Sequence, residues 1–402
     1  MRILKKLLIG LVILWGLLAL LVRAATPFIA DYRDQLAGLL SQQLGVPVSI
    51  GSLQARWYGL RPLLEFDRVR FGEPDGETLE VDRVTLDLEP ERLLTGTGSD
   101  ATRVTIDGMQ LTMIREPTGQ LHLEGIGTFV AADRANRDPL ALPGHVRLLN
   151  TRVAWTDRKV GKPPLMIDNI AVVLHRDGGR LRVRASLETE RGKADLSARL
   201  EGLPTTTDWN GDTYLRVANL DVADLFAQYL PASYGLRSLR LDLESWGRWE
   251  NAAPVHTQGN FQLRDLDLRS SAGDGAPLQV WQAGARFSLR RDAQDLLIGL
   301  KDLQLTFHEH RWPTGDVAFA LRQQPDGGQR IEAAADYLQV EDVVRILQVR
   351  LPWGGLKVPM EQIRPRGELR NLRLTADVAA QHLAWRGRAD FTGITTSATC
   401  NL

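Results

Sequence analysis

The sequence has one cysteine, no excess of charge of either sign and no recognisable catalytic motif. Cys400 is the one cysteine in 402 residues, so no disulfide framework can hold the fold together. Lys and Arg number 49, and Asp and Glu also number 49. A chain without net charge lacks the basic face that nucleic acid binding requires. We therefore expect a fold stabilised by packing alone, with no nucleic acid partner.

The motifs that would indicate an enzyme are also missing. No Gly-x-Ser-x-Gly elbow is present, and residues 96–98 lack the Lys and the following helix of a phosphate loop. Residues 174–177 superficially match a kinase catalytic loop but lack its companion motifs. Residues 308–310 (HEH) offer two imidazoles without a third ligand, which is more typical of an exposed strand end. We expect no enzymatic activity, no cofactor and no metal site.

One long apolar run lies near the N-terminus. Residues 7–22 read LLIGLVILWGLLALLV, which approaches the ~20 residues of a transmembrane helix. Arg2, Lys5 and Lys6 precede this run, and the charge asymmetry predicts a cytoplasmic N-terminus. A signal peptide cleaved near residues 22–24 is the alternative. We expect residues 1–25 to form a single inner-membrane anchor, with the bulk of the chain in the periplasm.

An amphipathic helix is predicted over residues 26–46. Thr26 and Pro27 are typical of a helix start, and Gly45 followed by Pro47 is typical of a helix end. Apolar residues recur every four positions between them, at Phe28, Tyr32, Leu36, Leu40 and Leu44. The helix must therefore bury one face against the segments that come after it in the chain.

From Val48 the apolar period changes to two, which is typical of strands. The pattern predicts an antiparallel β-meander over residues 47–130 and further strands over residues 145–394. Residues 217–225 (VANLDVADL) resemble residues 335–343 (ADYLQVEDV), and in both copies a strand leads into a short helix. Repeats of this size indicate a stacked, elongated β structure. The pattern stops at residues 395–402, which we interpret as an irregular tail of a truncated chain.

Nearly every predicted strand has one apolar face, yet few helices are available to cover these faces. The strand pattern alone favours a β-sandwich whose sheets cover each other, with a structural or regulatory role in envelope assembly. The alternative is a curved sheet whose apolar face forms an open groove. A fourteen-carbon acyl chain costs about 11 kcal/mol to expose to water, at about 0.8 kcal/mol per CH₂. The adjacent membrane anchor therefore favours a groove that shelters lipid tails. The candidate groove-lining residues are Leu181, Val183, Leu241, Leu243, Phe261 and Leu263.

Several sequence blocks resemble a known family. They are residues 44–53 (LGVPVSIGSL), 55–62 (ARWYGLRP), 64–71 and 111–123. Together they resemble the AsmA-like family of Gram-negative bacteria, YhdP type, over essentially the whole chain. The resemblance implies an elongated, antiparallel, repeating β-groove with a taco-like sheet, an N-terminal transmembrane helix and a few short helices. It also implies transport of phospholipid between the inner and outer membranes, without catalytic residues. Implied partners are phospholipid, the inner membrane, and the outer membrane or envelope proteins.

The cluster Arg56-Trp57-Tyr58 has two interpretations. Aromatic residues beside an arginine are typical of a membrane interface, where they can also contact a lipid phosphate. They can equally close the sheet against the first helix. We place the cluster at the membrane interface as a hypothesis and keep structural packing as the alternative.

Overall fold

The computed structural model divides into two units, residues 1–187 and residues 188–402, and each is described by itself. The described residues are 30–58, 61–72, 78–88, 102–116, 121–123, 144–158, 161, 163–202, 208–228, 230, 234–270, 277–292, 294–308, 310–324, 328–348, 363–379 and 382–398. The apolar run of residues 7–22, Thr26 to Phe28 and Cys400 therefore lie outside them. In the part of the chain that is described, no helix is both long and apolar enough to span a membrane.

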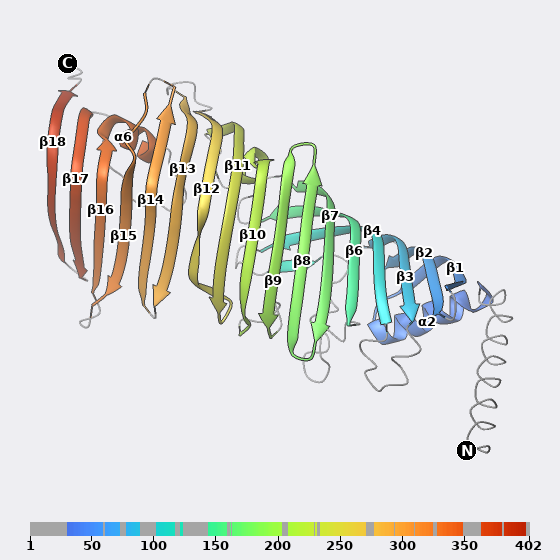
Figure 1. The fold of residues 1–402 in the computed structure, drawn as a ribbon. Coiled ribbons are helices and arrows are strands. Elements are labelled where there is room, and N and C mark those ends of the chain that lie inside the picture. Colours follow the sequence, from blue (N-terminus) through green and yellow to red (C-terminus); the bar gives the residue numbers. More distant parts are fainter. Residues whose placement is uncertain are drawn as a thin grey trace, which may run out of the picture. The chain divides into compact units, whose positions relative to one another are not determined.

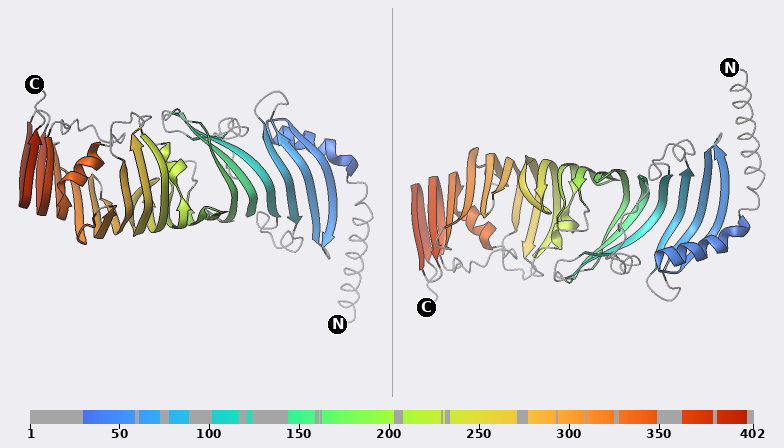
Figure 2. Two further views of the ribbon diagram at one scale, coloured as in Figure 1. Left: turned by 90° about the horizontal axis from the view of Figure 1, so that it is seen from above. Right: turned by 90° about the horizontal axis from the view of Figure 1, so that it is seen from below.

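The first described α-helix of unit 1 is α2 (Arg33–Leu44), which lies within the predicted helix of residues 26–46, and residues 30–32 before it form a 3-10 turn. Gly45 ends it in the left-handed conformation, with its N–H bonded to the Ser41 carbonyl at 2.9 Å. Leu36 and Leu40 pack against the buried residues of the first strands, as the four-residue spacing predicts. Tyr32, from the same predicted stripe, is exposed. The helix lies beside the first strands of the sheet (Figure 2).

The strands of unit 1 form a single sheet that is mostly antiparallel. They are β1 (Val48–Tyr58), β2 (Arg61–Phe71), β3 (Leu79–Leu88), β4 (Thr102–Arg115), β5 (Leu121–Leu123), β6 (His145–Asp157), β7 (Leu165–Asp177) and β8 (Arg180–Thr189). One prediction is wrong in detail, because β4 and β6 are parallel. Between β4 and β6 in the sequence lies β5, which pairs antiparallel with the end of β4. Because the chain does not pass directly from β4 to β6 through a tight hairpin, β6 can run parallel to β4.

The strands of unit 2 also form a single sheet, in which each strand pairs with the next in antiparallel order (Figure 1). They are β9 (Gly192–Glu201), β10 (Asn210–Asp221), β11 (Tyr234–Glu250), β12 (Ala253–Ser270), β13 (Leu278–Asp292), β14 (Asp295–Phe307), β15 (Gly315–Gln323), β16 (Gln329–Gln339), β17 (Ile363–Ala379) and β18 (His382–Ala398). Among the described residues no second sheet faces it. The unit is therefore an open sheet and not the sandwich that the strand pattern alone favoured.

The predicted repeat is present in unit 2 as two strand–helix–strand segments. Helix α5 (Ala223–Ala227) follows β10, and helix α6 (Val340–Gln348) follows β16. Both helices pack on the same side of the sheet, because the buried clusters that contain them share Leu263 and Leu266. The predicted irregular tail starts too early, since residues 395–398 belong to β18. Their backbone pairs with the start of β17, which a periodicity of side chains does not reveal.

Unusual backbone conformations recur inside strands of each unit, and we call these positions together the crease. Its residues have positive φ in the middle of strands: Arg68 (52°), Gly108 (70°), Asn150 (48°), Asn169 (61°), Asn219 (48°), Asp265 (58°), Asp302 (53°) and Asn371 (52°). Asn, Asp and Gly tolerate this conformation best. A Cβ on Gly108 would lie 2.0 Å from Asp82 Oδ2, so only glycine fits there.

The crease changes the phase of the strand pattern. In β12, Phe261 and Leu263 are followed on the same face by Leu266 and Leu268, a step of three where strict alternation requires two. The left-handed residue Asp265 takes up the extra step, as in a β-bulge. Each strand with such a residue can therefore bend without turning its apolar side chains to the opposite face.

We expect Asn219→Val to lower the thermal unfolding midpoint, because a β-branched residue at φ 48° is strained by about 1–2 kcal/mol. Asn219→Gly is the control, since glycine adopts this conformation without strain. Unfolding of the purified chain followed by tryptophan fluorescence measures both. Equal midpoints for the two variants would contradict the assigned role of the crease.

Candidate functional site

In each unit one face of the sheet carries apolar side chains, and we call it the apolar face. In unit 2 a row of directly paired residues crosses nine strands from β9 to β17, and all are apolar or small. The row is Leu196, Leu215, Ser245, Gly259, Phe287, Leu300, Val317, Ala335 and Leu372. Such a row requires that every strand keep the same register, because a slip of one residue would expose the apolar side chains on the other face.

Unit 1 carries a similar row. It runs through Ala55, Leu64, Leu86, Val104, Val146, Leu174 and Val183. Val183, a predicted groove residue, is its last member, and Leu181 is buried in the same strand. In unit 2 the predicted residues pair as Leu243 with Phe261 and Leu241 with Leu263. The structure therefore places all six predicted lining residues in strands, and the four of unit 2 adjoin one another.

The opposite face of unit 2 is polar and carries paired charges. Arg264 is bonded to Asp242, and Arg286 to Asp302 at 2.9 Å between Nε and Oδ2. Arg330 Nε lies 2.6 Å from Asp377 Oδ1, and this hydrogen bond lowers the pKa of the Asp377 carboxyl. Exposed pairs of this kind contribute little to stability. They make this face a largely solvated one, although the exposed side chains of Trp246 and Trp281 also lie on it.

Coverage of the apolar face in unit 2 is uneven. Beyond the crease, where α5 and α6 pack, the side chains of Leu239, Val280 and Phe307 are only 4–6% exposed. On the other side of the crease the apolar side chains are mostly half-buried, and Ile298 is 36% exposed. The helices therefore close one margin of the face and leave the other part open to solvent.

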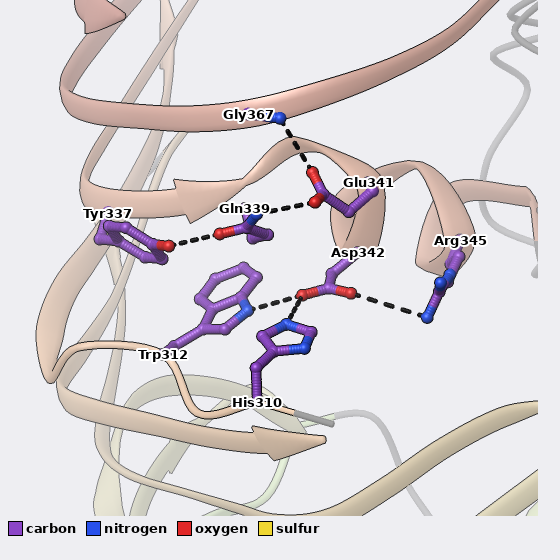
Figure 3. Close-up of polar contacts among 8 residues, drawn as sticks. All are labelled: His310, Trp312, Tyr337, Gln339, Glu341, Asp342, Arg345 and Gly367. Atoms are coloured by element: carbon purple, nitrogen blue, oxygen red, sulfur yellow. Dashed lines mark hydrogen bonds and ion pairs between the residues drawn. The ribbon is translucent and has the colours of Figure 1, made fainter. Parts of the chain in front are cut away.

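Helix α6 is held to the sheet by a buried carboxylate (Figure 3). Asp342 is 0% exposed, and its Oδ2 accepts hydrogen bonds from Trp312 Nε1 at 2.8 Å and from His310 Nε2 at 2.6 Å. Arg345 Nη1 lies 4.0 Å from the other carboxylate oxygen. The indole of Trp312 also packs near Phe307 and Tyr337. Asp342 thus connects the start of α6 to the segment between β14 and β15.

A second carboxylate ties the same helix to β17. Glu341 accepts hydrogen bonds from Gln339 Nε2 at 2.8 Å and from the Gly367 N–H at 3.1 Å. Burial raises the pKa of Glu341, but these bonds and one from its own backbone outweigh burial and leave the pKa below its ordinary value of 4.5. The carboxylate is therefore ionised at neutral pH and stabilises the position of α6.

The structure also places the histidines and the Arg56-Trp57-Tyr58 cluster that the sequence singled out. His310 bonds Asp342, and in the described part of the chain no group of three or more His, Cys, Asp or Glu side chains could hold a metal. His175 lies 3.1 Å from His145 between their Nδ1 atoms. Arg56 pairs with Glu65, and Trp57 lies opposite Pro62 at the far end of β1 from Val48. Nothing is described of the Tyr58 side chain, and contact of this cluster with a membrane stays a prediction.

A sequence model of the YhdP protein family matches residues 1–400. The chain belongs to the YhdP family. No curated protein and no solved structure matches it. The match confirms the resemblance that the N-terminal blocks indicated, and within each unit the open sheet agrees with the extended β structure expected for this YhdP-family chain.

The crease and the buried Asp342 were not anticipated from the sequence. A signal for the crease exists, because Asn or Asp precedes an apolar-polar-apolar triplet at residues 219–222 (NLDV), 265–268 (DLDL), 302–305 (DLQL) and 371–374 (NLRL). No such signal marks Asp342. Its counterpart in the first repeat, Asp224, is 75% exposed and pairs with Arg191.

We expect Asp342→Ala to lower the free energy of unfolding by about 1–3 kcal/mol, because it leaves the buried Trp312 N–H without an acceptor. Asp224→Ala is the matched control in the first repeat and should leave the unfolding transition unchanged. Urea unfolding followed by tryptophan fluorescence compares the two. A similar loss in both variants would contradict a special role for the buried carboxylate.

The lowered pKa of Glu341 predicts a dependence on acid. A carboxyl whose pKa is lower in the folded state contributes stability above its unfolded pKa, and this is lost as the pH falls through the folded value. Acid should therefore destabilise the native chain below about pH 4.5, and Glu341→Gln should make this fall shallower. The control Glu332→Gln alters an exposed ion-pair partner in β16. Thermal unfolding at a series of pH values measures the effect, and identical pH profiles for wild type and Glu341→Gln would refute it.

Proposed function

We propose that this chain shelters the acyl chains of phospholipids on its apolar face and carries them, without enzymatic chemistry, between the inner and outer membranes. The observation that carries the proposal is the row of apolar or small residues across nine strands, on a face that the helices cover only in part. Burial of each CH₂ group on such a face is worth about 0.8 kcal/mol. Passive sliding of acyl chains is compatible with this surface, because neighbouring strands present similar apolar side chains along the row.

The membership in the YhdP family supports the proposal from an independent direction. We place the chain in the bacterial envelope, anchored in the inner membrane by residues 7–22 with its bulk in the periplasm. Helix α2 then comes soon after the anchor and packs on the first strands, so the apolar face of unit 1 begins close to the bilayer. Proposed partners are phospholipid and the inner membrane, together with the outer membrane or envelope proteins.

The rival function is a structural or regulatory role in envelope assembly, with the apolar faces closed against each other. It would require a second layer over the apolar face. Within each unit the described strands form one sheet, and only short helices cover part of it. The open part of the face therefore favours a ligand over a closed sandwich.

A photoreactive amino acid at Leu243, on the apolar face, should crosslink to phospholipid in cells. The same amino acid at the neighbouring Glu244, which points to the opposite face and accepts a hydrogen bond from Tyr214, is the control. Mass spectrometry of the purified adducts identifies the lipid. We expect adducts from position 243 and none from position 244. Absence of lipid at position 243, or equal labelling at both, would exclude the proposed function.

A further inference from the structure

The two margins of the apolar face in unit 2 have different structures (Figure 1). At one margin lie α5 and α6, which follow β10 and β16. At the other margin, short connections join β11 to β12, β13 to β14, β15 to β16 and β17 to β18. We call this second margin the hairpin rim. The hairpin rim borders the open part of the apolar face. The headgroup of a lipid whose acyl chains lie on that open part can therefore reach water at the hairpin rim.

One cation stands in an otherwise apolar row at the hairpin rim. The directly paired residues across β13 to β18 are Arg291, Leu296, Leu321, Ile331, Ala376 and Trp385. Arg291 is the only charged member of this row. It is exposed, and no acidic side chain of the described residues lies within ion-pair distance of it. A guanidinium at the edge of an apolar surface offers five N–H donors to the anionic group of a molecule whose remainder is apolar.

The adjacent Arg290 provides a comparison within the same strand. It occupies the opposite face, because successive strand residues alternate, and it lies 3.8 Å from Asp292. The simplest alternative for Arg291 is that its aliphatic stem covers apolar surface while its head stays in water. In that case removal of the charge would not alter which lipid is bound.

We propose that Arg291 binds the phosphate group of a lipid whose acyl chains lie along the strands from the hairpin rim towards the crease. From Leu296 to Asp302 the strand spans about 20 Å at about 3.4 Å per residue. One leaflet of a bilayer has a hydrocarbon thickness of about 15 Å, half of ~30 Å. The open part of the face is therefore long enough for the chains of one lipid. This inference rests on the proposed function and adds the position of the headgroup.

In the test, the purified 402-residue chain is incubated with vesicles that contain equal amounts of dioleoyl-phosphatidylglycerol and dioleoylglycerol. These probes have the same acyl chains and differ in the phosphate-bearing headgroup. Bound lipid is extracted after re-isolation and quantified by mass spectrometry. Wild type should prefer the phospholipid, and Arg291→Gln should reduce this preference about tenfold while still binding dioleoylglycerol. Arg290→Gln should behave as wild type, and Arg291→Lys should retain most of the preference.

Each contrary result has a distinct meaning. Equal preference in Arg291→Gln and wild type would overturn the headgroup site but leave the lipid-binding function intact. An equal loss of both lipids in Arg291→Gln would overturn it in favour of a structural role for this arginine. Loss of the preference in excess inorganic phosphate would overturn it in favour of free phosphate as the ligand. Failure of wild type to bind either probe would reject the proposed function, and the headgroup site with it.

Discussion

The alternation of side chains along a strand governs this molecule, because it gives every strand one apolar face that water disfavours. In a sandwich a second sheet would solve the problem. Here each unit has a single sheet, and the described helices α2, α5 and α6 cover only part of its apolar face. The rest of the face is only half-buried, so its apolar side chains remain accessible to solvent.

In unit 2 the crease lies between the part of the apolar face that the helices cover and the part that stays open. Residues of positive φ, such as Asn219 and Asp302, bend the strands and keep the apolar side chains on one side across the bend. Beyond the bend the helices bury residues such as Phe307, and before it the face stays open. In unit 2 the positive-φ residues of the crease lie in β10, β12, β14 and β17, within the same sheet that has a packed margin and an accessible surface.

The two helical repeats have diverged in how they are fixed. In the first, Asp224 is a solvent-exposed partner of Arg191. In the second, the equivalent Asp342 is buried and joins α6 to Trp312 and His310. A buried carboxylate is costly unless it is hydrogen-bonded, so the geometry of this contact is more strictly specified than that of an exposed ion pair. Helix α6 therefore has a buried polar contact near its start, where α5 has an exposed ion pair.

The sequence by itself determined the β-rich class, the described part of the first helix, the 118-residue repeat of strand and helix, and the apolar identity of residues such as Leu243 and Phe261. These features arise from local periodicity and capping chemistry, which depend on neighbours in the chain. The tertiary structure decided between an open sheet and a sandwich, set the parallel pairing of β4 with β6, and buried Asp342 while exposing Asp224. Those outcomes depend on which strands and helices meet across long sequence separations, and a pattern of single residues carries no information on such pairings.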